Sequence, residues 1–192
     1  MTKRISLSET AHGMIRGHLR EGMLAIDATL GNGHDTVFLA QCVGEFGHVY
    51  GFDIQRQAVQ ATELRLRQQG MQGRATLFLA SHADMVRHIP PDLQGRIQVI
   101  MFNLGYLPGA DKSIITRTDS TLLALEAACR LLAERGLMTI MAYPGHSGGD
   151  QETDGVTQWL DRLDVSQYQS QIVFSQYHQA GAPRLFVIRK SA

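Results

Sequence analysis

The segment 27–36 places acidic, hydroxyl and glycine residues directly after a short apolar run, reading Asp-Ala-Thr-Leu-Gly-Asn-Gly-His-Asp-Thr. Gly31 and Gly33 can adopt positive φ and let a ligand approach the backbone closely. Asp53 ends a second apolar run twenty residues after Gly33, where a carboxylate can accept hydrogen bonds from both hydroxyls of a ribose. The combination predicts a nucleotide-binding turn, although the glycines alone would also fit an ordinary tight turn.

The chemistry of this turn narrows the choice of nucleotide. A dinucleotide fingerprint requires a third glycine where this chain has Thr36. Asp27, at the end of the first apolar run, suits the ammonium group of an amino acid better than a pyrophosphate. S-adenosylmethionine carries an amino acid and a ribose but no phosphate, so we expect it as the cofactor in preference to NAD.

A second reactive segment, Phe102–Gly109, follows another apolar run. It is similar to the Asn-Pro-Pro-Tyr loop of methyltransferases that modify amino groups, with Leu104-Gly105 in place of the two prolines. We expect the Asn103 side chain and the Leu104 carbonyl to accept hydrogen bonds from a target nitrogen, and Tyr106 to stack on a base. Asn103 as a simple turn former is the alternative.

The hydrophobic pattern predicts the elements that hold these segments. Strands are expected at 23–29, 48–54, 75–80, 97–103, 136–143, 168–175 and 184–190. Helices are expected at 8–19, 34–43, 55–69, 84–88, 120–132 and 150–163. Five β-α units followed by a hairpin predict an α/β fold, with a seven-stranded, mostly parallel sheet and helices on both faces. We expect one domain, 1–192, with 1–22 as an N-terminal helical segment.

The composition limits the partners. Lysine plus arginine and aspartate plus glutamate number 18 each, so binding to nucleic acid would need a local basic patch. The candidates for this patch are Lys112, Arg117, Arg16 and Arg20.

The cysteine, histidine and hydropathy patterns argue against other classes of protein. Cys42 and Cys129 have no pairing pattern, which is typical of a cytoplasmic protein. The histidines lack metal-binding spacing, so no metal is expected. No apolar run is long enough to span a membrane.

Several motifs together resemble the YtqB/MnmM family, long labelled as rRNA methylases. They are the turn at 27–36, Asp53-x-Gln55, the loop at 103–109, Asp111-Lys112, and Tyr143-x-Gly-His146-x-Gly-Gly149. One departure is Ala110, where the family pattern has a second glycine. The resemblance implies a Rossmann-like class I methyltransferase fold. It also implies methyl transfer to the amine of 5-aminomethyl-(2-thio)uridine at the tRNA wobble position.

The resemblance also implies roles for individual residues. The methionine part of the cofactor would contact Asp27, Thr29, Gly31, Asn32, Gly33, Asp35 and Thr36. The ribose and adenine would contact Asp53, Gln55, His82 and Asp84, of which the last two fit equally well as a loop histidine and a helix cap. Asn103 would border the cofactor and, with Leu104, Tyr106, Lys112 and Tyr143, position the acceptor. His146 would take the proton that the amine releases.

The implied partner is the anticodon region of tRNA, bound by a monomer or a homodimer. Two other readings remain open at this point. One is a methyltransferase acting on another RNA, such as rRNA, or on a small molecule. The other is a non-catalytic module that binds S-adenosylmethionine and associates with RNA.

Overall fold

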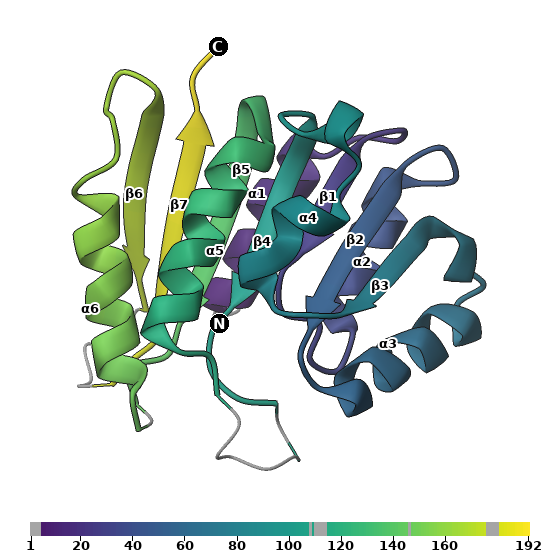
Figure 1. The fold of residues 1–192 in the computed structure, drawn as a ribbon, viewed down its shortest axis with the longest axis horizontal. Helices are drawn as coiled ribbons and strands as arrows, with labels where there is room; N and C mark the ends of the chain where they lie inside the picture. Colours follow the sequence, from purple (N-terminus) through teal and green to yellow (C-terminus); the bar gives the residue numbers. More distant parts are fainter. Residues whose placement is uncertain (1–4, 108, 110–114, 146, 176–180) are drawn as a thin grey trace.

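The structure is a computed structural model that describes residues 5–107, 109, 115–145, 147–175 and 181–192. Seven strands form one sheet in the order β3-β2-β1-β4-β5-β7-β6 (Figure 1). They are β1 (Leu24–Asp27), β2 (His48–Asp53), β3 (Ala75–Leu79), β4 (Ile97–Asn103), β5 (Leu132–Ala142), β6 (Tyr168–Phe174) and β7 (Arg184–Lys190). The first five run parallel, and β7 pairs antiparallel with both β5 and β6. The predicted mostly parallel sheet with a C-terminal hairpin is confirmed.

Helices cover both faces of this sheet. They are α1 (Leu7–His18), α2 (His34–Val43), α3 (Arg56–Gln68), α4 (Met85–His88), α5 (Thr118–Leu131) and α6 (Gly149–Leu160). Short 3-10 turns lie at Gln72–Arg74, His82–Asp84 and Pro91–Leu93. In Figure 1, α4 and α5 lie in front of the sheet, whereas α1 and α2 lie behind it.

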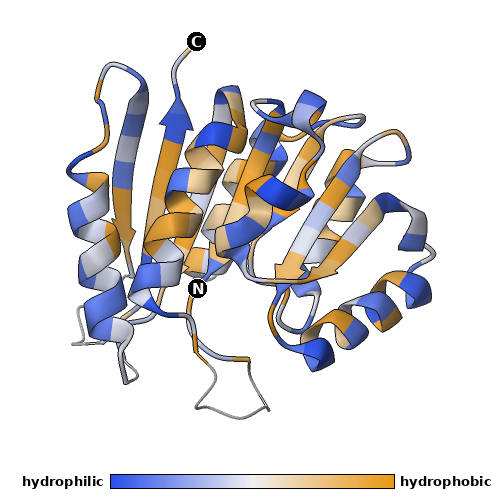
Figure 2. Ribbon diagram, viewed as in Figure 1, coloured by the Kyte–Doolittle hydropathy of each residue, from blue (hydrophilic) through white to orange (hydrophobic). Residues whose placement is uncertain are grey.

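Alternate residues of the central strands belong to two separate hydrophobic cores, because successive side chains of a strand point to opposite faces of the sheet. In β4, Val99 and Met101 pack with α1, α2 and α3, whereas Ile100 and Phe102 pack with α4, α5 and α6. The central strands are therefore hydrophobic along nearly their whole length, as Figure 2 shows, while the outer sides of the helices are hydrophilic. Strands buried on both faces read as continuous apolar runs, which is why they were predictable.

Several element boundaries differ from the prediction, among them the end of α6, which we expected at Leu163 and which lies at Leu160. Two further differences have a clear physical reason. We expected α1 to begin at a Ser8 cap, but the cap is Ser6, which forms a capping box with Glu9. Ser8 therefore lies inside the first turn of α1. We also expected a helix to Leu132 and a strand only from Gly136. Instead β5 begins at Leu132 and its register with β4 shifts, with Arg135 at φ 59°.

Within the described ranges, no helix combines the length and apolar character that a membrane span requires.

Candidate active site

The strand order reverses between β1 and β4, and a cavity of about 750 Å³ opens at the carboxyl ends of these strands. Ligands of open α/β sheets bind at this type of position, and the volume is in the range of small-molecule and cofactor sites.

The cavity brings together most of the residues predicted from the sequence. Those on its lining are Thr29, Gly31, Asn32, Asp35, Asp53, Gln55, His82, Asn103, Leu104, Tyr106 and Tyr143. Asp27, Gly33, Thr36 and Asp84 are not on the lining. Lys112 and His146 lie outside the described residues.

Asp27 is buried beneath the turn that follows β1. Its Oδ1 accepts a hydrogen bond from the backbone N–H of Thr29 over 3.2 Å, and its Oδ2 accepts one from the Thr36 hydroxyl over 2.6 Å. Burial, assisted by the charge of Asp35, raises the pKa of Asp27 to about 7. Asp27 therefore shapes the turn from below, whereas Asp35 and Asp53 are carboxyl groups on the cavity lining.

Gly33 is required by packing as well as by backbone conformation. It precedes α2 with φ 78°, and an added Cβ would lie 2.8 Å from Cα of Thr62 on α3. Nearby, Nε of Arg65 donates a hydrogen bond to the Asn32 carbonyl over 2.9 Å. The turn is therefore packed closely against α3, while its residues Gly31 and Asn32 line the cavity.

Asp53 lies at the end of β2, on the opposite side of the turn. Its Oδ2 accepts the N–H of Gly31 over 3.1 Å, and its Oδ1 accepts the N–H of Gln55 over 2.8 Å. Burial raises the pKa of Asp53, while these N–H groups oppose the shift. Each carboxylate oxygen keeps lone-pair capacity for a further donor, so Asp53 can hold a diol at the cavity wall.

The cavity wall beyond Asp53 is uncharged. His82 is buried, and this burial lowers its pKa to about 4, so the ring is neutral at pH 7. It lies beside Phe102, with ring centroids 5.9 Å apart. Together with Phe52 and Ile54 it forms a lining suited to a flat, uncharged ring. Asp84 instead pairs with Arg87 over 3.1 Å.

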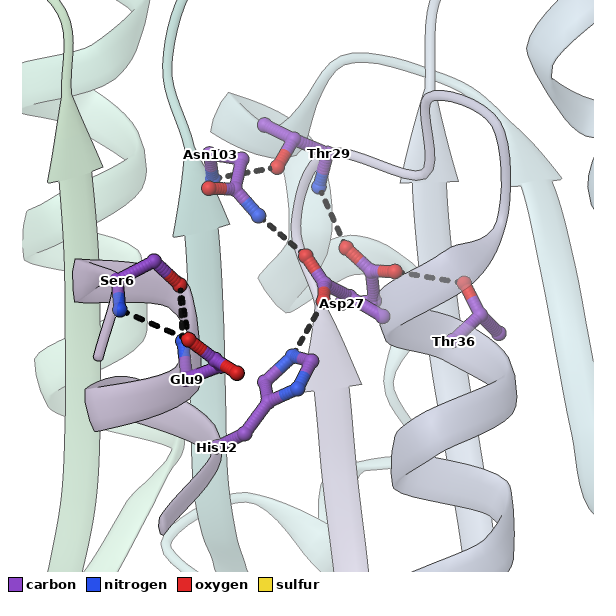
Figure 3. A network of polar contacts seen from close by, with 8 residues as sticks. Ser6, Glu9, His12, Asp27, Thr29, Thr36 and Asn103 are labelled. Carbon is purple, nitrogen blue, oxygen red and sulfur yellow. Dashed lines mark hydrogen bonds and ion pairs between the residues drawn. The ribbon is translucent and has the colours of Figure 1, made fainter. Parts of the chain in front are cut away.

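Asn103 ends β4 and is tied to the turn after β1. Its backbone N–H donates to Oγ1 of Thr29 over 2.7 Å, and its side-chain Nδ2 donates to Oδ2 of Asp35. The other carboxylate oxygen, Oδ1, lies 2.7 Å from Nε2 of His12. Figure 3 shows Asn103, Thr29 and His12 approaching the same region from separate elements.

The segment after Asn103 is fastened at its base. Gly105 and Thr116 exchange two hydrogen bonds of 2.8 Å, and Tyr106 bridges to Ile115. The Thr116 hydroxyl then donates to the buried Glu152 of α6 over 2.7 Å.

Two tyrosines complete this end of the cavity. Tyr106 and Tyr143 line it and are each 38% exposed, so both rings are available to a ligand. Burial raises the pKa of Tyr143, the Asp35 charge adds to this, and a hydrogen bond with Ser8 opposes it. Tyr143 is therefore protonated at neutral pH and can donate but not act as a base.

Sequence reasoning missed the contribution of α1, whose Ser8 and His12 line the cavity. The capping box at Ser6 could have placed the start of α1 two residues earlier than we expected, but it does not place the helix at the cavity. The other lining residues not predicted include Leu30, His34, Phe52, Ile54, Ala80, Ser81, Leu107, Ile115, Thr116, Ser120, Gly145 and Gly181.

The arginines proposed for an RNA-binding patch do not form one group. Arg20 donates to the carbonyls of Arg16, Gly17 and Leu19 and so caps the end of α1 remote from the cavity. The Arg16 guanidinium lies over the Phe38 ring, 5.1 Å from its centroid. Arg117 directly follows Thr116, which lines the cavity. Among the described candidates, Arg117 is therefore the one next to a lining residue in the sequence.

No group of three or more potential metal ligands occurs among the described residues.

The sheet order, the cavity at its reversal point and the antiparallel β7 define the Rossmann-like class I methyltransferase fold. A "putative rRNA-methylase" from Clostridium thermocellum superimposes with a TM-score of 0.92 and 37% identity, over 99% of this chain and 100% of that one. A "putative methyltransferase" from Streptococcus mutans, solved in complex with SAH, gives a TM-score of 0.84 and 33% identity over 99% of both chains.

The family model described as "Putative rRNA methylase" matches residues 49–190, and the chain belongs to this family. It is also 39% identical over 173 residues to the chloroplastic tRNA (mnm(5)s(2)U34)-methyltransferase of Arabidopsis thaliana. That match covers 86% of this chain but 62% of the plant protein. The family resemblance inferred from the sequence motifs is confirmed.

Proposed function

We propose that this protein transfers a methyl group from S-adenosylmethionine to the amine of 5-aminomethyl-(2-thio)uridine at the wobble position of tRNA. The observation that carries the proposal is the position of Asn103, whose carboxamide lines the same cavity as the acidic strand end at Asp53. The 39% identity to a plant tRNA (mnm(5)s(2)U34)-methyltransferase supports the choice of substrate.

The described residues fit S-adenosylmethionine. Asp53 would accept hydrogen bonds from the ribose hydroxyls, and the neutral wall at His82, Phe52 and Ile54 would take the adenine. The turn at Gly31 and Asn32 would face the methionine part. A relative of the same fold was solved with SAH, which supports the same assignment. When bound, S-adenosylmethionine supplies an electrophilic methyl group on a sulfonium, and its transfer leaves the thioether SAH.

The protein's own task is to align a neutral amine and exclude water. Asn103 Oδ1 and the Leu104 carbonyl would accept hydrogen bonds from the amine, while Tyr106 stacks on the base. Positioning of this kind supplies much of the rate acceleration in bimolecular transfers. A partly apolar cavity lowers the pKa of an alkylamine by disfavouring its charged form, which increases the fraction able to react.

Nucleoside mass spectrometry tests the substrate directly. The protein and S-adenosylmethionine are incubated with tRNA carrying the aminomethyl group and with the same tRNA lacking it. We expect a methyl group to be added only to the first, with a rate that rises with pH until the bound amine is neutral. Equal methylation of both tRNAs would disprove the aminomethyl assignment.

A second candidate substrate is rRNA, favoured by the family description. Parallel incubation with rRNA from cells lacking the enzyme separates the two substrates.

We further propose that the anticodon arm of tRNA is the contact region, that the protein works as a monomer or homodimer, and that it acts in the cytoplasm.

A further inference from the structure

Three polar side chains from three separate elements meet on the cavity wall. His12 comes from α1, Asp35 from the first turn of α2, and Asn103 from the last position of β4. Asp35 lies between the other two and binds His12 through Oδ1 and Asn103 through Oδ2. Figure 3 shows His12 and Asn103 on opposite sides of this contact.

We propose that Asp35, held by His12, is a positioning residue that fixes the Asn103 carboxamide with its oxygen toward the acceptor. The proposal rests on the function proposed above. A carboxylate accepts hydrogen bonds and donates none, so the group of Asn103 that faces Asp35 is its NH2. Its Oδ1 therefore points away from Asp35. The backbone on which this side chain turns is itself fixed by Thr29.

His12 holds the carboxylate in place. Its ring stacks on Phe38, with centroids 3.8 Å apart and planes 11° from parallel. The side chains of His12 and Asp35 are 24% and 20% exposed, so their hydrogen bond is largely shielded from competing water. The N-terminal helix thereby contributes to the reaction centre by holding the Asp35 carboxylate in place.

The orientation of the Asn103 carboxamide decides whether the amine can react. When Oδ1 faces the acceptor, it receives an amine N–H and leaves the nitrogen lone pair free to attack the methyl carbon. With the carboxamide inverted, Nδ2–H would donate to that lone pair and occupy it. An inverted carboxamide would thus oppose methyl transfer.

The variant Asp35→Asn tests this directly, because an asparagine can present either its oxygen or its NH2 to Asn103. We expect kcat for the aminomethyl tRNA to fall at least tenfold, with the KM for this tRNA changing less than threefold. His12→Leu should lower kcat several-fold, and His12→Gln, which keeps a donor, should restore part of it. The matched control is Asp161→Asn, an exposed carboxyl at the end of α6, which should match the wild type.

A double-mutant comparison separates positioning from general structural damage. If Asp35 acts through Asn103, adding Asp35→Asn to Asn103→Ala should lower kcat by less than twofold. A further tenfold loss in the Asn103→Ala background would overturn the proposal. So would an unchanged kcat in Asp35→Asn alone.

A second readout needs no substrate. NMR of ¹⁵N-labelled protein should show one Asn103 side-chain amide proton that exchanges slowly, assigned by its loss in Asn103→Ala. In Asp35→Asn or His12→Leu that exchange should accelerate at least tenfold. Unchanged exchange in both variants would overturn the proposal even if tRNA proved not to be the substrate. Conversely, a wild type that leaves tRNA unmodified would disprove the proposed function, while the exchange measurement would still decide the orientation of Asn103.

Discussion

The Thr116 hydroxyl donates a hydrogen bond to Glu152 over 2.7 Å, and Glu152 is only 2% exposed. The same hydroxyl oxygen accepts the backbone N–H of Gly105 over 2.8 Å. Gly105 lies two residues after Asn103, so the Glu152 side chain links α6 to the proposed acceptor segment. The second oxygen of Glu152 is taken by the Thr121 hydroxyl over 2.7 Å, which fixes the carboxylate from the α5 side.

Thr116→Val keeps the shape of the side chain and removes both of its hydrogen bonds. We expect the free energy of unfolding to fall by about 1–3 kcal/mol, because the Gly105 N–H and one Glu152 oxygen lose their partner. We also expect methyl transfer to slow about tenfold through misplacement of Asn103, with SAH affinity within threefold. Thr157→Val, which removes a bond to the Thr153 carbonyl within α6, is the matched control and should keep full activity. Lost stability with unchanged turnover in Thr116→Val would limit Thr116 to a structural role.

Alanine substitutions at Gly33 and Gly70 distinguish the loss of stability caused by backbone strain from the loss caused by close packing. Both have positive φ, 78° and 67°, but an added Cβ meets Thr62 at 2.8 Å only at Gly33, since nothing lies within 4 Å at Gly70. Left-handed strain should cost each alanine variant about 1 kcal/mol. Gly33→Ala should lose about 1–3 kcal/mol more through overpacking against α3, and it should bind SAH at least tenfold more weakly. Chemical denaturation and calorimetry check this, and equal losses in both variants would contradict it.

The sequence carried enough information to predict the sheet, because strands buried on both faces read as unbroken apolar runs. It also predicted Asp53 and Asn103 at the cavity, since both end such a run and strand ends meet at one edge of the sheet. The fold class was therefore predictable from local patterns alone.

Other features depend on contacts between distant segments and left no local pattern. His12 reaches the cavity because α1 packs across β5 and β7, an arrangement that no sequence spacing encodes. Asp27 was predicted to contact the cofactor, and the structure places its side chain beneath the turn, buried and off the cavity lining. The start of β5 was predicted wrongly for a similar reason, because this strand pairs with β4 through an irregular register near Arg135.

The proposed cofactor contact of Asp53 can be measured without a substrate. Asp53→Ala should weaken SAH binding by about 1–3 kcal/mol, because a charge-assisted contact is lost and the Gly31 N–H loses its acceptor. Since burial raises the pKa of Asp53, wild-type affinity should also decline on acidification before most exposed carboxyls titrate. Isothermal calorimetry gives both quantities. Asp84→Ala is the control, because Asp84 pairs with Arg87 and is not on the cavity lining. The SAH affinity of this variant should stay within twofold of the wild type. A stronger effect from Asp84 than from Asp53 would reverse these assignments.

Asp27 and His82 should influence folding stability with opposite signs. The pKa of Asp27 rises from 3.8 to about 7 on folding, so the folded state holds a proton that the unfolded state releases. The stabilisation that Asp27 contributes to the folded state is full below pH 4 and is lost as the pH rises to 7. The pKa of His82 falls from 6.5 to about 4. Its contribution is full above pH 6.5 and is lost as the pH falls to 4. The two trends offset one another in the wild type between pH 4 and 6.5.

Asp27→Asn isolates the carboxyl contribution, because asparagine can still accept the Thr29 N–H and face the Thr36 hydroxyl. One titrating proton changes stability by up to about 1.4 kcal/mol per pH unit. The free energy of unfolding of Asp27→Asn, relative to that of the wild type, should therefore rise by about 2 kcal/mol between pH 5 and pH 7. Urea denaturation at several pH values measures this difference, with the exposed Asp161→Asn as a control that should show none. A difference that does not change with pH would mean that Asp27 is already ionised in the folded protein at pH 5. In that case the hydrogen bonds from Thr29 and Thr36 would outweigh its burial beside Asp35.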